Sequence, residues 1–289
     1  MPHKKLLFIG FGDIAARTSH ILLTEGCDVT GIARSERSVP PGLNYWRGAV
    51  NDAHIIQQLN DNTFDLAVIT LAPDGRREQD YQQAYEETSR QLVRVWKASG
   101  RAPELVIYVS SSSVYHHSEG EWVDEDSVVT PKSPLAQRLF AAERIWQDSP
   151  LNTCIVRFSG IYGPGRTQLL RQVAAGQGGA RDNSPFTNRI HVDDCVGSLL
   201  HLCHRHWLCK PLAHLYLASD DTPAPAWEVR QWLAEQMGFG PDHLQETPES
   251  GRSGSKRCSN ERLRATGYEF KHPSYHSGYT ELLKSREWE

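Results

Sequence analysis

The chain has 289 residues, of which 39% are hydrophobic and 23% are charged, enough for one large α/β domain or a domain with a smaller lobe. Its net charge of −4 gives no reason to expect a nucleic-acid or membrane partner. We therefore expect a globular protein whose partner is a small molecule.

The first apolar run, at residues 6–9, follows two lysines and ends at a glycine. It is too short for the core of a signal peptide and far below the roughly 20 residues of a membrane span, so we interpret it as a buried strand. The six cysteines are scattered and form no CxxC pair, and a chain of this size does not need disulfides. A protein of the reducing cytoplasm fits these features best.

Short apolar segments rich in Val and Ile recur up to residue 160, separated by stretches long enough for helices. We expect strands at residues 6–10, 28–33, 64–72, 104–110 and 152–160, and helices at 13–25, 76–99 and 134–147. Continuous apolar runs are typical of strands that are buried on both faces of a parallel sheet. The pattern predicts an α/β fold of the Rossmann type with a doubly wound parallel sheet.

A glycine turn directly follows the first expected strand and opens the first helix. Gly10, Gly12 and Ala15 form the pattern G-x-G-x-x-A. Gly10 permits a tight turn, Gly12 lets a pyrophosphate approach the backbone, and Ala15 lets helix and strand pack closely. Because the strand, the helix and the second strand all fall in place, the turn predicts a dinucleotide site that also includes Asp13 and Ile14.

The second expected strand ends without the acidic residue that binds the ribose 2′-hydroxyl of NAD. Arg34, Ser35 and Arg37 follow it, and an arginine there can bind a 2′-phosphate through charge-assisted hydrogen bonds. NADP is therefore favoured. NAD stays open, because Glu36 could contact the ribose and the arginines could be surface charges. We also assign to cofactor binding three residues at the ends of later strands: Leu71, Ala72 and Ser110.

A group of histidines and cysteines occurs near the end of a further expected helix, at positions 201, 203, 204, 206 and 209. These residue types could bind zinc. A helix, however, brings only i, i+3 and i+4 residues onto one face, so ligands at i, i+2 and i+5 diverge. We therefore expect no metal site here and interpret the segment as an amphipathic helix with outward histidines.

Three later segments carry a resemblance to a known family. Residues 108–115 (YVSSSSVY) resemble a strand-end SSSxVYG segment, residues 157–165 (RFSGIYGPG) an RxxxxYGPG loop, and residues 189–194 (RIHVDD) an IHVDD segment. With the glycine turn, these motifs resemble the extended short-chain dehydrogenases/reductases, the epimerase/dehydratase family, in order over at least residues 5–200. Residues 255–268 are similar to the C-terminal part of an atypical epimerase branch of that family.

The resemblance places the family's catalytic serine at Ser111, four residues before Tyr115. It places the catalytic tyrosine and lysine on the helix at 134–147, where this chain has Leu135 and Leu139. In that geometry the tyrosine supplies a proton and the lysine lowers its pKa, and leucine can do neither. No Y-x-x-x-K occurs anywhere in the chain, so the departure from the family pattern is real.

Three functions remain open. The chain could be an NADP-dependent oxidoreductase or isomerase with a relocated acid/base, acting on a small or nucleotide-sugar-like substrate. It could instead bind NADP without turnover, as a sensor or regulatory protein, or hold a nucleotide-like substrate for a non-redox reaction. The titratable residues expected near a nicotinamide are Tyr115, His116, His117, Tyr162 and His191. Tyr115 is the first candidate for the proton donor. As for the assembly, we consider a homodimer.

We expect a dinucleotide-binding domain at residues 1–165 and a smaller mixed substrate lobe at 166–289, with 189–206 returning to the Rossmann core. Residues 219–225 and 247–255 are expected loops, because Pro, Gly and Ser are frequent there. In the lobe, three arginines could bind phosphate or be surface charges, at positions 166, 171 and 181. Two aspartates, at 193 and 194, are expected to cap a helix that begins near residue 196.

Overall fold

The protein, described here as a computed structural model over residues 4–246 and 254–285, forms two compact units that interleave along the chain. The first unit comprises Met1–Val114, Pro131–Arg157 and Val196–Tyr216, and the second comprises Tyr115–Thr130, Phe158–Cys195 and Leu217–Glu289. The expected division into domains at residue 165 stays a prediction. Most of the expected loop at 247–255 lies outside the described residues.

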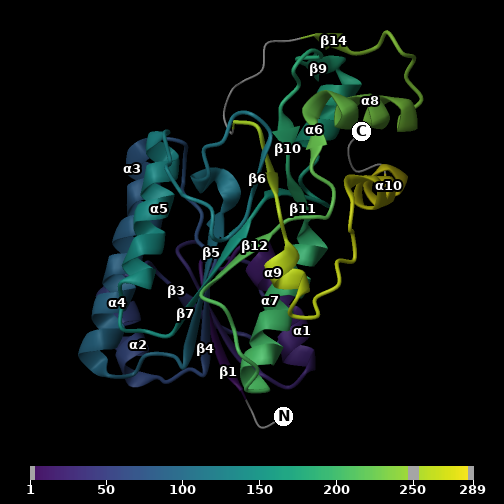
Figure 1. Ribbon diagram of the computed structural model, residues 1–289. Coiled ribbons are helices and arrows are strands. Elements are labelled where there is room, and N and C mark those ends of the chain that lie inside the picture. The colour runs from purple at the N-terminus through teal and green to yellow at the C-terminus, as the bar shows by residue number, and fades with distance from the viewer. Residues whose placement is uncertain (1–3, 247–253, 286–289) are drawn as a thin grey trace. The chain divides into compact units, whose positions relative to one another are not determined.

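A seven-stranded sheet holds the first unit together (Figure 1). Its strands are β1 (Lys5–Ile9), β2 (Asp28–Ala33), β3 (Asn44–Arg47), β4 (Leu66–Ile69), β5 (Leu105–Ser111), β7 (Thr153–Phe158) and β12 (Leu215–Ala218). They are ordered β12-β7-β5-β4-β1-β2-β3, and the pairs β1–β2, β1–β4, β2–β3 and β4–β5 are parallel. The expected Rossmann-type α/β fold with a doubly wound parallel sheet is confirmed.

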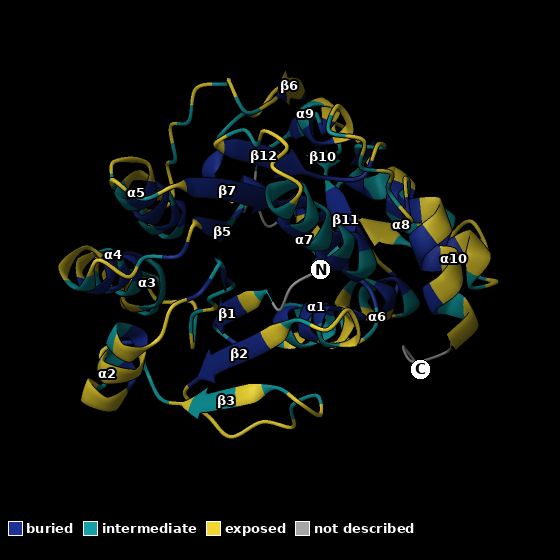
Figure 2. Ribbon diagram, turned by 90° about the horizontal axis from the view of Figure 1, so that it is seen from below, coloured by how far each residue is buried: buried dark blue, intermediate teal, exposed yellow. Residues whose placement is uncertain are grey.

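Helices cover both faces of this sheet, which explains why its inner strands consist mainly of apolar residues. The helices are α1 (Asp13–Thr24), α2 (Ala53–Asp61), α3 (Glu78–Tyr81), a π-helical segment (Gln82–Glu87), α4 (Thr88–Ser99), a 3₁₀ turn (Ser112–Val114), α5 (Pro134–Gln147) and α7 (Val192–Trp207). Helices α2, α4 and α5 lie on one face and α1 and α7 on the other (Figures 1 and 2). Figure 2 shows β7 buried, whereas the edge strand β3 is partly exposed.

The structure differs from the sequence-based expectation at five elements. The helix expected at 76–99 is divided into α3, the π-helical segment and α4. Strands β3 and β12 and helix α2 were not expected, because they are short and lack a long apolar run. Helix α7 begins at Val192, four residues earlier than expected, so Asp193 and Asp194 lie within its first turn.

Local signals explain how two of the helices begin. Gly10 has a φ of 86°, a conformation that favours glycine, and it turns the chain from β1 toward α1. Ser133 caps α5, because its hydroxyl oxygen accepts a hydrogen bond from the Ala136 N–H at 3.2 Å. Pro134 follows at the first helical position, where a missing N–H costs nothing. These signals position the glycine turn and the helix that carries Leu135 and Leu139.

The described part of the second unit is built from short strand pairs and four helices of its own. Its strands are β6 (Glu121–Val123), β8 (Gly160–Tyr162), β9 (Gln177–Gly179), β10 (Phe186–Thr187), β11 (Arg189–His191), β13 (Ala224–Pro225), β14 (Gln245–Glu246) and β15 (Lys256–Cys258). Its helices are α6 (Gln168–Ala174), α8 (Ala226–Gln236), α9 (Glu261–Arg264) and α10 (Tyr275–Ser285). A core that includes Leu170, Leu233, Tyr279 and Leu282 joins α6, α8 and α10. Within residues 4–246 and 254–285, no helix is long and apolar enough to span a membrane.

Candidate functional site

The first unit contains a cavity of about 610 Å³ beside the ends of β1, β2 and β4. In an open parallel sheet, this carboxyl edge of the strands is where ligands bind. Of the residues expected to bind the cofactor, seven line the cavity: Gly10, Gly12, Arg34, Ser35, Arg37, Leu71 and Ala72. The structure thus brings the glycine turn and the residues after β2 and β4 to one space.

Gly10 and Gly12 differ in what surrounds them. A Cβ atom on Gly10 would lie 2.6 Å from the backbone oxygen of Thr70, so a side chain there collides with the next strand. A Cβ atom on Gly12 would have its nearest neighbour at 3.9 Å, the backbone oxygen of Gly10. The fold therefore requires glycine at position 10, while glycine at position 12 leaves open space that a pyrophosphate could occupy.

The other expected cofactor-binding residues lie outside the cavity lining. Asp13 forms an ion pair with Arg17, with 2.8 Å between Oδ1 and Nε, one turn along α1. Ala15 is fully buried, as close packing of helix and strand requires. Ser110 is buried and its hydroxyl donates a hydrogen bond to Glu143 at 2.5 Å. Ile14 lies in α1 and also does not line the cavity.

Arg34 is held by a neighbour that sequence reasoning missed. Both of its terminal nitrogens donate to the carboxylate oxygens of Asp74, at 2.5 Å each. This hydrogen bonding raises the pKa of Arg34 and lowers the pKa of Asp74. Asp74 follows β4 and lines the same cavity. The carboxylate of Asp74 therefore accepts the same hydrogen bonds that Arg34 would donate to a 2′-phosphate.

The rest of the lining comes from the loop after β3 and from the helices before β5. The loop contributes residues 48–51, the π-helical segment contributes Gln83, Ala84 and Glu87, and α4 contributes Arg90 and Arg94, among others. Neither a π-helical segment nor the short strand β3 has a clear sequence pattern. Single-turn π segments are rare and frequently lie at functional sites, but this break in the helix is visible only in the structure, so no sequence signal indicated these residues.

Helix α5 shows what replaces the tyrosine and lysine of the family. Leu139 is buried with 5% of its surface exposed, and Leu135 is half-buried. Arg138, between them in the sequence, forms ion pairs with Glu78 at 2.8 Å and with Glu86 at 3.0 Å. On this part of α5, Leu139 packs in the interior and Arg138 forms ion pairs. Neither position 135 nor position 139 carries a group able to transfer a proton.

The two residues expected to act in catalysis are held by local contacts. Ser111 ends β5, and its hydroxyl oxygen accepts a hydrogen bond from the Ser113 N–H at 3.2 Å. Tyr115 is 1% exposed, and its hydroxyl donates to the backbone oxygen of Asp124 at 2.6 Å. Tyr115 would have to exchange this contact to reach a substrate. Their catalytic roles stay a prediction.

The second unit contains its own cavity of about 990 Å³. Three arginines line it, Arg166, Arg171 and Arg189, together with Asn188. Two of the three arginines considered for a phosphate pocket are therefore among its lining residues. Arg181 is not among them, and its guanidinium carbon lies 5.6 Å from the centre of the Trp227 ring.

The remaining titratable candidates lie near the start of α7 or in the segment after Tyr115. His191 pairs in register with Tyr162 between β11 and β8. Burial and the nearby His272 lower the pKa of His191 to about 4, and burial raises the pKa of Tyr162. His117 has a buried Nδ1 without a hydrogen-bond partner among the described residues. His116 is half-buried.

Asp194 has a different task from the expected helix cap. Its carboxylate accepts hydrogen bonds from the backbone N–H groups of Lys271 at 2.7 Å and His272 at 2.9 Å, and from the Tyr268 hydroxyl at 3.0 Å. It is fully buried. Asp194 therefore fastens the loop at 268–272 to the first turn of α7.

Comparison with known proteins agrees with this architecture. The NAD dependent epimerase/dehydratase family matches residues 10–205. No curated protein sequence matches the chain. A solved structure from Methylobacillus flagellatus, described as a NAD-dependent epimerase/dehydratase, is 29% identical over 98% of both chains, with a TM-score of 0.80.

Two further solved structures share the fold at lower sequence identity. MoeE5, in complex with UDP-glucose and NAD, is 22% identical over 97% of both chains, with a TM-score of 0.78. UDP-glucose 4-epimerase from Thermotoga maritima, with UDP-glucose, is 14% identical over 96% of this chain and 99% of its own, with a TM-score of 0.79. The glycine turn, the sheet and the matched residues together place this chain in the NAD dependent epimerase/dehydratase family.

Proposed function

We propose that this protein binds NADP(H) in the cytoplasm and acts as an oxidoreductase or isomerase on a small or nucleotide-sugar-like substrate. The observation that carries the proposal is the cavity of the first unit, where Gly12 leaves space for a pyrophosphate and Arg34 follows β2. Guanidinium groups bind phosphate through two parallel hydrogen bonds. Arg34, with Arg37 on the same lining, therefore supports NADP over NAD.

The cavity of the second unit supports the substrate class. Arg166, Arg171 and Arg189 line it, and three guanidinium groups around one space favour an anionic ligand such as a diphosphate. Relatives of the fold have been solved with UDP-glucose, as in MoeE5 and the Thermotoga maritima epimerase. A nucleotide sugar carries a negatively charged diphosphate, which the arginines would bind, and its size suits a cavity of this volume.

The proposed chemistry uses a proton donor other than the usual tyrosine. Tyr115 would donate the proton and Ser111 would orient the reacting oxygen, because Ser111 is the last residue of β5 and Tyr115 follows the 3₁₀ turn after it, at the edge where ligands bind in such sheets. Loss of a positioned acid/base costs roughly 10²–10⁴ in rate. We therefore expect slow turnover on ordinary nucleotide hexoses.

A second candidate is a protein that binds the dinucleotide without turnover, as a sensor or regulator. The observation that favours it is the face of α5, where Leu139 is buried and Arg138 is paired with Glu78 and Glu86. Under this alternative the cofactor cavity is retained, and Tyr115 has the packing role that its contact with Asp124 already provides.

Titration calorimetry with NADP and NAD tests the cofactor, using the wild type and Arg34→Ala. Each charge-assisted contact is worth roughly 1.5–3 kcal/mol, so we expect Arg34→Ala to weaken NADP binding about tenfold or more and to leave NAD binding unchanged. Equal affinity of the wild type for both nucleotides would reject the NADP preference.

Turnover is tested by screening carbonyl and nucleotide-sugar substrates for NADPH oxidation, then comparing wild type with Tyr115→Phe and Ser111→Ala. Activity that both variants reduce supports the relocated acid. Robust activity that neither variant changes rejects it. Tight NADP binding without activity on any substrate supports the non-catalytic alternative.

The expected homodimer is tested separately, by measuring the mass of the particle in the same samples by sedimentation.

A further inference from the structure

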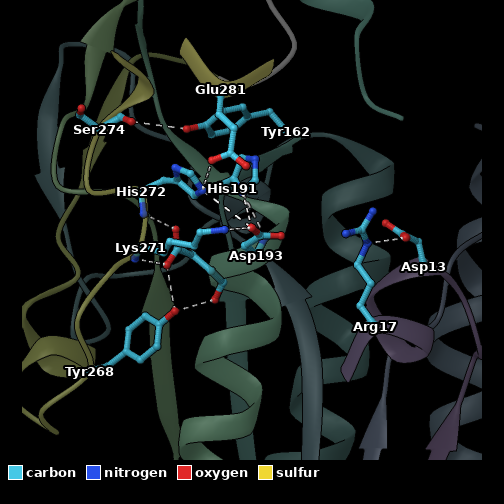
Figure 3. Close-up of polar contacts among 11 residues, drawn as sticks. Asp13, Arg17, Tyr162, His191, Asp193, Tyr268, Lys271, His272, Ser274 and Glu281 are labelled. Carbon is cyan, nitrogen blue, oxygen red and sulfur yellow. Dashed lines mark hydrogen bonds and ion pairs between the residues drawn. The ribbon is translucent and has the colours of Figure 1, made fainter. Parts of the chain in front are cut away.

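A cluster of side chains lies at the start of α7 (Figure 3), and none of its members is among the residues that line the two cavities. His191, Asp193 and His272 each offer one ligand atom there, and these atoms lie within 4.8 Å of one another. His191 ends β11, Asp193 is in the first turn of α7, and His272 comes from the loop before α10. Segments distant in sequence therefore converge on one point of the second unit.

The distances in the cluster are too long for hydrogen bonds and close to those of a metal site. His272 Nε2 is 3.8 Å from Asp193 Oδ2 and 3.7 Å from Glu281 Oε2, and His191 Nδ1 is 3.8 Å from the same Asp193 oxygen. Ligand atoms that bind Zn²⁺ at about 2.0–2.1 Å in a tetrahedron are roughly 3.3–3.4 Å apart. Small side-chain rotations would close the difference.

One ligand atom has an unmet requirement in the described structure. The His272 side chain is 5% exposed, and its Nε2 is buried without a hydrogen-bond partner among the described residues. A buried polar atom without a partner costs about 1–3 kcal/mol. It is directed toward the carboxylates of Asp193 and Glu281, as the dashed lines of Figure 3 show. A cation between these groups would satisfy the nitrogen and both carboxylates.

We propose that His191, Asp193, His272 and Glu281 bind one divalent first-row transition-metal ion, with Zn²⁺ as the expected ion. Imidazole nitrogens combined with carboxylate oxygens are suited to such ions. His191 Nδ1 accepts a hydrogen bond from the Asp193 N–H at 3.2 Å, so its lone pair is in use. To bind the ion, the His191 ring must turn so that this lone pair leaves the N–H. The site joins β11, α7, the loop at 268–272 and α10.

Lys271 controls the affinity of this site. Its Nζ is 2.5 Å from Asp193 Oδ2, the same oxygen that faces both histidines, and its side chain is 59% exposed. An ammonium group there competes with the metal for the carboxylate and repels it. Because the side chain is largely exposed, it can turn into solvent when the ion binds. Removal of Lys271 should therefore tighten metal binding.

The test is a titration of the full chain with Co²⁺ alone, followed by visible absorption, in wild type, His272→Ala, Lys271→Met and His204→Ala. His204 is the control because it belongs to the other histidine-rich segment and contacts Glu25 at 2.8 Å. We expect one Co²⁺ per chain without a thiolate charge-transfer band. His272→Ala should bind at least 30-fold more weakly, Lys271→Met three- to tenfold more tightly, and His204→Ala like wild type.

Several results would overturn the proposal. They are binding that survives His272→Ala, binding that His204→Ala removes, a thiolate band, or no binding by either the wild type or Lys271→Met. Thermal melting identifies a variant that fails to fold. If His272→Ala does not fold, Glu281→Gln, whose carboxylate side chain is 62% exposed, serves in its place. The expected loss of affinity is then about fivefold, and unchanged binding rejects the site.

Discussion

The two cavities are lined in different ways. The cavity of the first unit lies at the ends of parallel strands, and its most restrictive element is the backbone turn at Gly10 and Gly12. The cavity of the second unit is lined by side chains from short strands and from α6 and α10, with three arginines among them. The first region therefore depends on backbone geometry, whereas the second depends on how charged and polar groups are buried. Substitutions should separate these two dependences.

The largest effect is expected from Gly12→Val in the first unit. A valine side chain fits the fold, because the nearest atom to a Cβ there is 3.9 Å away, but it fills the space that a pyrophosphate needs. Dinucleotide binding should fall below detection, with at least a roughly 100-fold loss, while the melting temperature stays near that of wild type. Calorimetry and thermal melting measure the two quantities.

Gly10→Ala is the matched comparison at the same turn. Its Cβ would lie 2.6 Å from the Thr70 oxygen, and the residue has a φ of 86°. This variant should lose stability in addition to dinucleotide affinity. If Gly12→Val binds the dinucleotide, or if Gly10→Ala is as stable as wild type, backbone geometry does not determine the first cavity.

Features that depend on local backbone geometry could be predicted from the sequence, whereas contacts between distant side chains could not. The glycine turn and strands β1, β2, β4, β5 and β7 were predicted, because each depends on consecutive residues and their apolar run. The contact of Arg34 with Asp74 could not be predicted, since it joins residues 40 positions apart. The cluster of His191 and His272 depends likewise on how distant segments pack. Structure that depends on neighbouring residues can be predicted from the sequence, whereas a contact between distant loops cannot.

The next largest effect concerns a buried ion pair between α5 and β7. Arg157 donates to both oxygens of Glu143, at 3.0 and 2.6 Å, and both side chains are almost fully buried. Glu143→Gln leaves the arginine charge without its counter-ion, which costs about 3–5 kcal/mol of unfolding free energy. Urea unfolding measures this loss. The double variant Glu143→Leu/Arg157→Met should recover much of it, and a double variant no more stable than the single one contradicts the account.

Asp220 gives the second unit a corresponding, pH-dependent weakness. It is 1% exposed, its Oδ2 has no hydrogen-bond partner among the described residues, and burial raises its pKa to about 7 despite the nearby Arg189. Between pH 4 and 7 the folded state therefore holds a proton that the unfolded state releases. Stability falls as pH rises through this window, and the loss persists above it.

Asp220→Asn should remove this loss. Relative to wild type, we expect its unfolding free energy to be higher by up to about 4 kcal/mol at pH 8 and by much less at pH 4. Urea unfolding at the two pH values measures the difference, and Asp242→Asn, at an exposed position of the same unit, is the control. A difference that does not change with pH would show that burial of this carboxyl is not the cause.

The smallest effect is expected where a side chain acts within the first cavity. Asp74 occupies both terminal nitrogens of Arg34 and places a negative charge beside the proposed 2′-phosphate position. The pair is largely exposed, with 56% and 69% of the two side chains accessible, and exposed pairs contribute only about 0.2–1 kcal/mol. Asp74→Asn should therefore raise affinity for NADP about threefold and leave NAD affinity unchanged.

Asp80→Asn is the control, because Asp80 pairs with Arg77 at 2.8 Å and does not line the cavity. A gain for both nucleotides would indicate that Asp74 repels the pyrophosphate and not the 2′-phosphate, and it would assign the selectivity of this cavity to another residue.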